Sequence, residues 1–165
     1  MRIHHYNPDM SYLIDGHNLI PKIPGLSLEA MDDEEQLVAL LQEFCRKARK
    51  RVDVYFDNAP AGQPRTRKYG AVQAYLVQQG TPADQAIEAR LLRLGKQARN
   101  WTVVSSDRRV QTAGKAAHAR VLSSEAFADL LIQTRQAKTP GKEDEADMSV
   151  DEIDEWLRLF GGKSK

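Results

Sequence analysis

The alternation of short β-forming runs with amphipathic helical patterns constrains this chain more than any other feature. The β-forming runs are rich in Val, Ile and Tyr, and most of them are followed by a helical pattern. This order is typical of βαβ units, in which helices cover a mostly parallel sheet. The sequence therefore predicts an α/β fold with a central, twisted, mostly parallel sheet. Strands are expected at Ser11–Asp15, Val52–Asp57, Val72–Val77, Trp101–Ser105 and Arg120–Leu122, and helices at Asp32–Arg49, Pro82–Arg99, Arg108–Ala117 and Ser124–Gln136.

Helix-start signals support several of these boundaries. Thr81-Pro82 places a hydroxyl at an expected N-cap and a proline at the first helical position. Ser106, and Ser123 or Ser124, precede the two later helices and are further expected caps.

The domain organisation follows from length and composition. A chain of 165 residues with 41% hydrophobic composition suits one compact domain with a short appendage, and we expect the domain at residues 1–137. Residues 138–148 are polar and acidic and contain Pro and Gly, which predicts a flexible linker. Residues 149–165 begin with a capping box and predict a short amphipathic helix, which either packs on the domain or docks on a protein partner or the ribosome. Its apolar positions are Ile153, Trp156, Leu157 and Phe160.

Charge and cysteine content narrow the setting. The net charge of +1 and the pI of about 7.9 argue neither for nor against a nucleic-acid partner. The single cysteine, Cys45, rules out a disulfide framework and a cysteine-based zinc site, so a cytoplasmic location is expected. The first ten residues lack the apolar core of a signal peptide, and no run approaches the roughly 20 apolar residues that cross a bilayer. We therefore expect no membrane association.

Acidic residues follow three of the predicted strands. Asp15 ends the first strand, Asp57 ends the second, and Asp107 follows the strand at Trp101–Ser105. Ligands of open parallel sheets bind beyond the carboxyl ends of the strands, near the point where the strand order reverses. The three carboxylates are therefore expected at one edge of the sheet.

Two further acids lie on the helix that follows Thr81-Pro82. Asp84 and Glu88 are four residues apart on one helix face, where like charges repel each other and favour a cation. An oxygen-only ligand set of this kind selects Mg²⁺ or Mn²⁺ over zinc, so His17 is not expected among the ligands. Such ions neutralise phosphate oxygens and activate water, so phosphodiester hydrolysis is the chemistry that fits.

Each of these residues also has a purely structural interpretation. Asp15 alone could be a turn residue, and Asp107 could be only a favourable acid at the start of the next helix. Glu88 could belong to a solvated helix face, and Asn18 could be a turn residue or could orient a ligand or a phosphate.

Four segments in this order resemble one known family. LIDGHNLI, VYFDNAP, TPADQAIEARL and VVSSDRRV are similar to the YacP-like NYN branch of the PIN-like ribonucleases, from about Tyr12 to Leu131. The resemblance implies a PIN-like three-layer α/β/α fold and metal-dependent endonucleolytic cleavage of RNA. It implies catalytic roles for Asp15, Asp84 and Asp107, and metal binding by these three with Asp57 and Glu88. Asn18, Ser105 and Ser106 would contact the substrate. Asn58 follows Asp57 where relatives often have Gly.

RNA binding requires positive charge around an acidic pocket. The segment Arg65–Tyr69 is expected to be a loop at the active edge that contacts RNA through Arg65, Arg67 and Lys68, with Tyr69 able to stack on a base. Arg108 is a further expected contact, to single-stranded RNA in particular. The basic run Arg46–Arg51 is equally consistent with complementing a helix dipole.

Three other functions are compatible with parts of the pattern. A non-catalytic RNA- or ribosome-binding module could keep the fold, but it would not need Asp15, Asp84 and Asp107 together. A nuclease acting on DNA could use the same carboxylates, because only contacts to the 2′-hydroxyl distinguish the two substrates. A phosphotransfer domain is disfavoured, since Asp15-Gly16-His17 lacks the second Asp of a phosphatase motif and no Lys ends a late strand.

Overall fold

A computed structural model describes residues 11–29, 31–60, 62 and 64–136. The predicted linker at 138–148 and the predicted helix at 149–165 lie outside the described residues. Within them, no helix is both long and apolar enough to cross a membrane.

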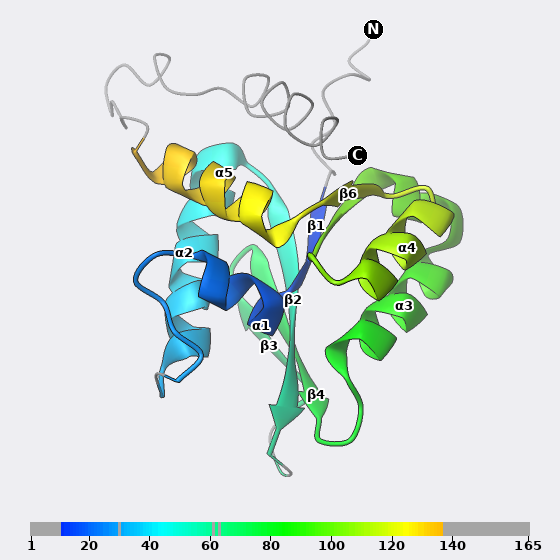
Figure 1. The fold of residues 1–165 in the computed structure, drawn as a ribbon, viewed down its shortest axis with the longest axis horizontal. Helices are drawn as coiled ribbons and strands as arrows, with labels where there is room; N and C mark the ends of the chain where they lie inside the picture. The colour runs from blue at the N-terminus through cyan, green and yellow to red at the C-terminus, as the bar shows by residue number, and fades with distance from the viewer. Residues whose placement is uncertain (1–10, 30, 61, 63, 137–165) are drawn as a thin grey trace, which may run out of the picture.

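A six-stranded sheet forms the centre of the molecule (Figure 1). The strand order is β3-β4-β2-β1-β5-β6, and all neighbours are parallel except β3 and β4. The chain builds the sheet outward from β1 through β2 and β4, and then returns to place β5 on the other side of β1. The strand order therefore reverses between β1 and β5, which is where ligands of such sheets bind. The strands are β1 (Ser11–Asp15), β2 (Arg51–Ala59), β3 (Thr66–Tyr69), β4 (Val72–Gln78), β5 (Trp101–Val104) and β6 (Arg120–Leu122).

Helices cover both faces of the sheet, which gives the predicted α/β/α layers (Figure 1). α2 and α5 pack on one face, and α3 and α4 pack on the other. The helical segments are α1 (Gly16–Leu19), the 3-10 turn η2 (Ile20–Lys22), α2 (Asp33–Ala48), α3 (Ala83–Leu94), the 3-10 segment η3 (Gly95–Asn100), α4 (Arg108–Ala116) and α5 (Ser124–Gln136).

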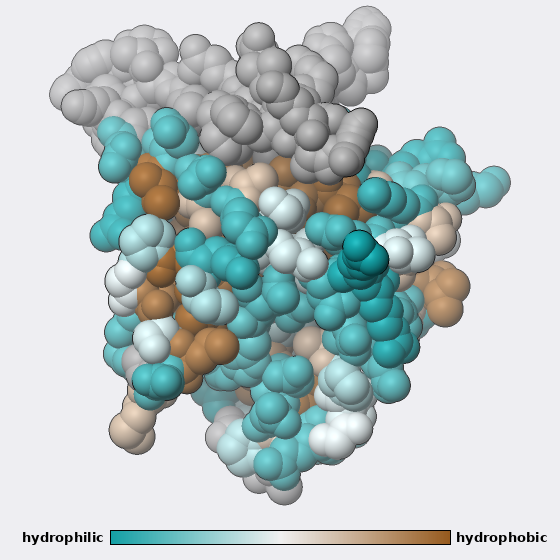
Figure 2. Space-filling view, viewed as in Figure 1, coloured by the Kyte–Doolittle hydropathy of each residue, from teal (hydrophilic) through white to brown (hydrophobic). Residues whose placement is uncertain are grey.

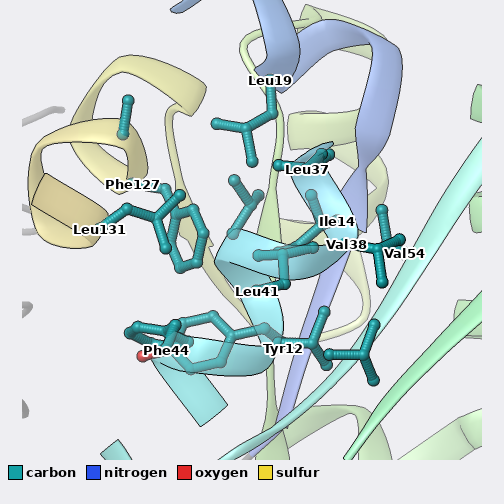
Figure 3. Close-up of a cluster of buried hydrophobic side chains, with 14 of the residues drawn as sticks. Tyr12, Ile14, Leu19, Leu37, Val38, Leu41, Phe44, Val54, Phe127 and Leu131 are labelled. Atoms are coloured by element: carbon teal, nitrogen blue, oxygen red, sulfur yellow. The ribbon is translucent and has the colours of Figure 1, made fainter. Parts of the chain in front are cut away.

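The central strand β1 separates two hydrophobic cores. Successive side chains of a strand point to opposite faces, so Tyr12 joins one core and Leu13 joins the other. On the face covered by α2 and α5, the ring centroids of Tyr12, Phe44 and Phe127 lie 5.3 to 5.4 Å from one another (Figure 3). Tyr12 is fully buried and Trp101 nearly so, as expected for core residues. This packing fixes the carboxyl end of β1 relative to its neighbours.

The segment Arg65–Tyr69 is not the loop that was predicted. Thr66–Tyr69 forms strand β3, which pairs antiparallel with β4 at the edge of the sheet. Its residues are mostly exposed and polar, so the two-residue apolar alternation that marks a half-buried strand is missing from the sequence. Backbone pairing with β4 supplies the stabilisation instead.

The boundaries of α3 also differ from the prediction. Pro82 occupies the N-cap with an extended backbone, so Thr81 is not the cap and the helix starts at Ala83. The Ala83 N–H instead donates to Asp57 Oδ2 at 3.4 Å, so a carboxylate from β2 meets the helix start. The regular helix ends at Leu94, because Gly95 adopts a positive φ of 56° and the chain continues as η3.

Candidate active site

Asp15 lies at the buried carboxyl end of β1, next to the point where the strand order reverses. Its side chain accepts a hydrogen bond from Ser105 Oγ at 3.3 Å. Burial raises the pKa of Asp15 to about 6; the Ser105 hydrogen bond opposes this rise, and the nearby charges of Asp57 and Asp107 add to it. The acids at or just after the ends of β2 and β5 are therefore close enough to affect Asp15.

Gly16 allows the chain to turn closely over β2 directly after Asp15. A Cβ at this position would lie 2.4 Å from Phe56 Cε1 and 2.9 Å from the Tyr55 carbonyl oxygen. A larger residue would push the turn away from β2. The close approach places the next residue, His17, over the end of β2.

His17 bridges two carboxylates. Its Nδ1 lies 2.8 Å from Asp57 Oδ1, and its Nε2 lies 2.8 Å from Glu34 Oε2. The hydrogen bond to Glu34 is the main cause that raises the pKa of His17 to about 9, against the effect of burial, with a further contribution from Asp57. The imidazolium is therefore charged at neutral pH and donates both N–H groups. Sequence reasoning missed Glu34, which lies in the first turn of α2.

The Arg109 guanidinium lies beside both Asp84 and Glu88, the two acids predicted to bind a metal ion. The Arg109 guanidinium donates to both carboxylate oxygens of Glu88 at 2.5 and 3.0 Å, and its Nη1 lies 3.8 Å from Asp84 Oδ2. Asp84 Oδ1 is buried and has no hydrogen-bond partner among the described residues. Of the two acids, Asp84 is thus the one with an unsatisfied oxygen.

Asp107 caps α4. Its side chain accepts hydrogen bonds from the N–H groups of Arg109 and Val110 at 2.8 and 3.3 Å, and its own N–H donates to Ser105 Oγ at 3.0 Å. Ser105 is fully buried, and its hydroxyl connects Asp15 with Asp107 through these two hydrogen bonds. The structural role as a helix-start residue is therefore present, and it fixes Asp107 at the same edge as Asp15.

Asn18 and Ser106 form a network across the neighbouring strand ends. Asn18 Oδ1 accepts hydrogen bonds from the Ser106 N–H at 2.8 Å and from Ser124 Oγ at 2.6 Å. Ser106 Oγ accepts from the Ser124 N–H at 2.9 Å and donates to Glu125 Oε1 at 2.5 Å. These contacts tie α1 and the end of β5 to the start of α5. Glu125 was also missed, and the Ser106 hydrogen bond is the main cause that lowers its pKa.

The expected basic contacts are exposed. Arg65, Arg67 and Lys68 line or flank β3 at the sheet edge, and Arg108 begins α4. Tyr69 is only half-buried and packs against the core. Figure 2 shows hydrophilic side chains over the centre of the molecular surface turned toward the viewer, between α1 and the first turns of α3 and α4.

The basic run at residues 46–51 has structural contacts of its own. Lys47 Nζ donates to the carbonyl oxygens of Thr134 and Arg135 at 3.3 and 3.2 Å, which links α2 to α5. Arg49 ends α2 in the left-handed conformation, with a φ of 58°.

The oxygen donors at this edge match a hard divalent cation in kind. Asp15, Asp57 and Asp84 belong to β1, β2 and α3, and Asp107 is the N-cap residue of α4. Asp84 Oδ1 is an unpaired buried acceptor among the described residues. In the conformation described for residues 11–136, no three His, Cys, Asp or Glu side chains are gathered tightly enough to hold an ion as they stand. Binding would therefore require some of these carboxylates to turn toward a common point.

Comparison with known proteins supplies the family. The family model described as the YacP-like NYN domain matches residues 12–157. The chain belongs to this family. The crystal structure of Rae1 (YacP) from Bacillus subtilis is similar, with 24% sequence identity, a TM-score of 0.58 and coverage of 91% of each chain. A mutant of the same protein has 24% identity and a TM-score of 0.59, with 90% of this chain and 91% of that chain covered. A search of curated proteins found no match.

Membership of the YacP-like NYN family agrees with the observed layers and strand order. The predicted PIN-like α/β fold is confirmed, both by the six-stranded sheet flanked by helices and by the two crystal structures. The family match extends further along the chain than the resemblance seen in the sequence, which ended near Leu131.

Proposed function

We propose that this YacP-like NYN protein is a metal-dependent endoribonuclease that hydrolyses single-stranded RNA at the edge formed by Asp15, Asp84 and Asp107. Two observations carry the proposal: the charges of Asp57 and Asp107 reach Asp15 at the carboxyl ends of the strands, and Asp84 at the start of α3 has a buried, unpaired oxygen. The charges of Asp57 and Asp107 disfavour ionisation of Asp15, and a bound cation would offset this repulsion. The family supports a nuclease, and Mg²⁺ or Mn²⁺ suits the oxygen-only ligands.

Each side chain has a distinct part in this proposal. Asp15, Asp84 and Asp107 would hold the cation, with Asp57 as a further ligand whose orientation is set by His17. Glu88 has a weaker claim, because Arg109 already binds both of its oxygens. When bound, the cation would neutralise phosphate oxygens and activate water for in-line attack.

Basic residues at two sides of the acidic edge would hold the RNA backbone. Arg108 is exposed beside Asp107, and Arg65, Arg67 and Lys68 are exposed along the β3 edge. Asn18 and Ser106 would act indirectly as positioning residues, since their hydrogen bonds join α1, the end of β5 and the start of α5. Such a positive rim attracts phosphate without selecting a base sequence.

The test is cleavage of a labelled single-stranded RNA and of the DNA of the same sequence, with Mn²⁺, Mg²⁺ or EDTA. We expect RNA cleavage with either metal, none with EDTA, and a loss of at least about 100-fold in the Asp84→Asn variant. Glu88→Gln is the matched control on the same helix, and it should retain far more activity. DNA cleavage at equal rates would show a general nuclease, and binding of RNA without cleavage would show a non-catalytic module.

A further inference from the structure

Three neighbouring strands place a row of side chains on the α3 face of the sheet. In the strand registers, Tyr55 of β2 lies opposite Tyr75 of β4, and Tyr75 lies opposite Thr66 of β3. Residues directly opposite each other on adjacent strands project to the same face. The rings of Tyr55 and Tyr75 are stacked, with centroids 4.6 Å apart and an angle of 8° between their planes.

Arg90 of α3 holds the two rings in place. Its Nη1 donates to the Tyr55 hydroxyl at 3.0 Å, and its Nη2 donates to the buried Asp53 at 2.8 Å. The guanidinium carbon lies 5.4 Å from the ring centroid of Tyr75 and 4.9 Å from that of Trp101. These contacts hold the stack in place before any ligand arrives, and such preorganisation lowers the entropy that binding would cost.

The row continues from Tyr75 to a small residue and then to an empty space. Thr66 occupies the position where a third ring would extend the stack. A cavity of about 380 Å³ lies there, within the size range of small-molecule sites. Its lining includes Tyr75, Thr66 and Gln78 from the strands, Thr81 and Ala86 from the α3 side, and Arg65 beside the edge strand.

The cavity is next to the acidic edge. Thr81 is three residues from Asp84, and Tyr55 is two residues from Asp57 on the same strand. One RNA strand could therefore place a base in the cavity and a nearby phosphate at the acids. Arg65 at the cavity rim is suited to the phosphate that follows such a base.

We propose that this cavity is a stacking subsite for one unpaired nucleobase of the RNA substrate, which extends the Tyr55–Tyr75 stack on the face of Tyr75 turned toward Thr66. The inference rests on the proposed function, because it requires single-stranded RNA as the ligand. A ring face accepts any base, so the subsite would favour unpaired over paired RNA without selecting a sequence.

The test measures equilibrium binding of labelled single-stranded RNAs to the full chain in EDTA, with one abasic nucleotide moved stepwise along the strand. In the unsubstituted protein, one abasic position should weaken binding by about 5- to 150-fold, the range measured for loss of one base stacked on an aromatic ring. The same position should have little effect in Tyr75→Leu. Tyr75→Phe should keep the effect, because it keeps the ring.

Two further variants separate this inference from a folding defect. Thr66→Phe places a ring in the cavity and leaves Tyr75 intact, and it should also remove the abasic effect. Gln73→Ala, on the same strand and outside the cavity lining, should retain it. RNA cleavage by the unsubstituted protein with equal abasic effects in all variants would overturn the subsite alone. Absence of both RNA binding and cleavage would overturn the subsite together with the proposed function.

Discussion

Replacing Asp15 with Asn should stabilise the metal-free protein at neutral pH. The carboxyl group is buried at the end of β1, and its pKa rises from the ordinary 3.8 to about 6. Because the folded-state pKa is the higher one, the protonated carboxyl favours folding; this contribution is fully present below pH 3.8 and is lost as the pH rises through 6. At about 1.4 kcal/mol per pKa unit, ionisation of Asp15 lowers the free energy of unfolding by about 3 kcal/mol above pH 6.

The assay is urea or thermal unfolding of the unsubstituted protein and Asp15→Asn in EDTA, at intervals from pH 4 to pH 8. The free energies of unfolding of the two proteins should be nearly equal at pH 4, and the variant should become the more stable of the two as the pH rises. About 3 kcal/mol is the upper limit of that gain, because the new amide N–H group needs a partner of its own. Asp57→Asn is the matched control: it removes a charged partner of His17 and should lower stability at neutral pH by about 1–3 kcal/mol. A lower stability of Asp15→Asn at pH 7, or a difference independent of pH, would refute the reasoning.

Substitutions of His17, Asp53 and Gly16 test three other contacts near the ends of β1 and β2. His17→Gln should reduce the free energy of unfolding by about 1–3 kcal/mol at pH 6. Because the pKa of His17 is raised from 6.5 to about 9, this difference should shrink as the pH rises through 9 in a pH series of urea unfolding. A difference that does not change with pH would contradict the charged bridge. Asp53→Ala leaves the half-buried Arg90 without its 2.8 Å partner and should lower the free energy of unfolding by about 3 kcal/mol in chemical denaturation, with partial recovery when Arg90 is also replaced by Leu. A loss below about 1 kcal/mol would argue against the pair. Gly16→Ala brings a Cβ to 2.4 Å from Phe56 and should cost about 1–3 kcal/mol, visible as a lower Tm, whereas an unchanged Tm would mean that the turn is not tight.

The fold and the main acids were predictable because both depend on local pattern. The apolar runs that end in Asp15 and Asp57 mark buried parallel strands, and parallel strands bring their carboxyl ends to one edge. The strand β3 could not be recognised in the same way, since an exposed edge strand carries no apolar alternation.

The helix-borne members of the site depended on packing that a sequence does not reveal. Glu34 and Glu125 are first-turn acids, as Asp84 is, and α2 and α5 also begin near the carboxyl edge of the sheet. Which first turns reach the site depends on how each helix lies on the sheet. The pairing of Arg109 with Glu88 likewise depends on the contact between α3 and α4, which are separate in sequence.

Binding of Mn²⁺ to the metal-free protein is the most direct test of whether Asp15, Asp84 and Asp107 share a divalent cation. Isothermal titration of the unsubstituted protein, Asp84→Asn and Glu88→Gln, each at pH 7.5 after treatment with EDTA and its removal, would measure this binding without RNA. If these three carboxylates hold the ion, binding is saturable and its affinity falls at least about tenfold in Asp84→Asn and much less in Glu88→Gln. Absence of binding, or equal affinity in all three proteins, would contradict the shared cation site.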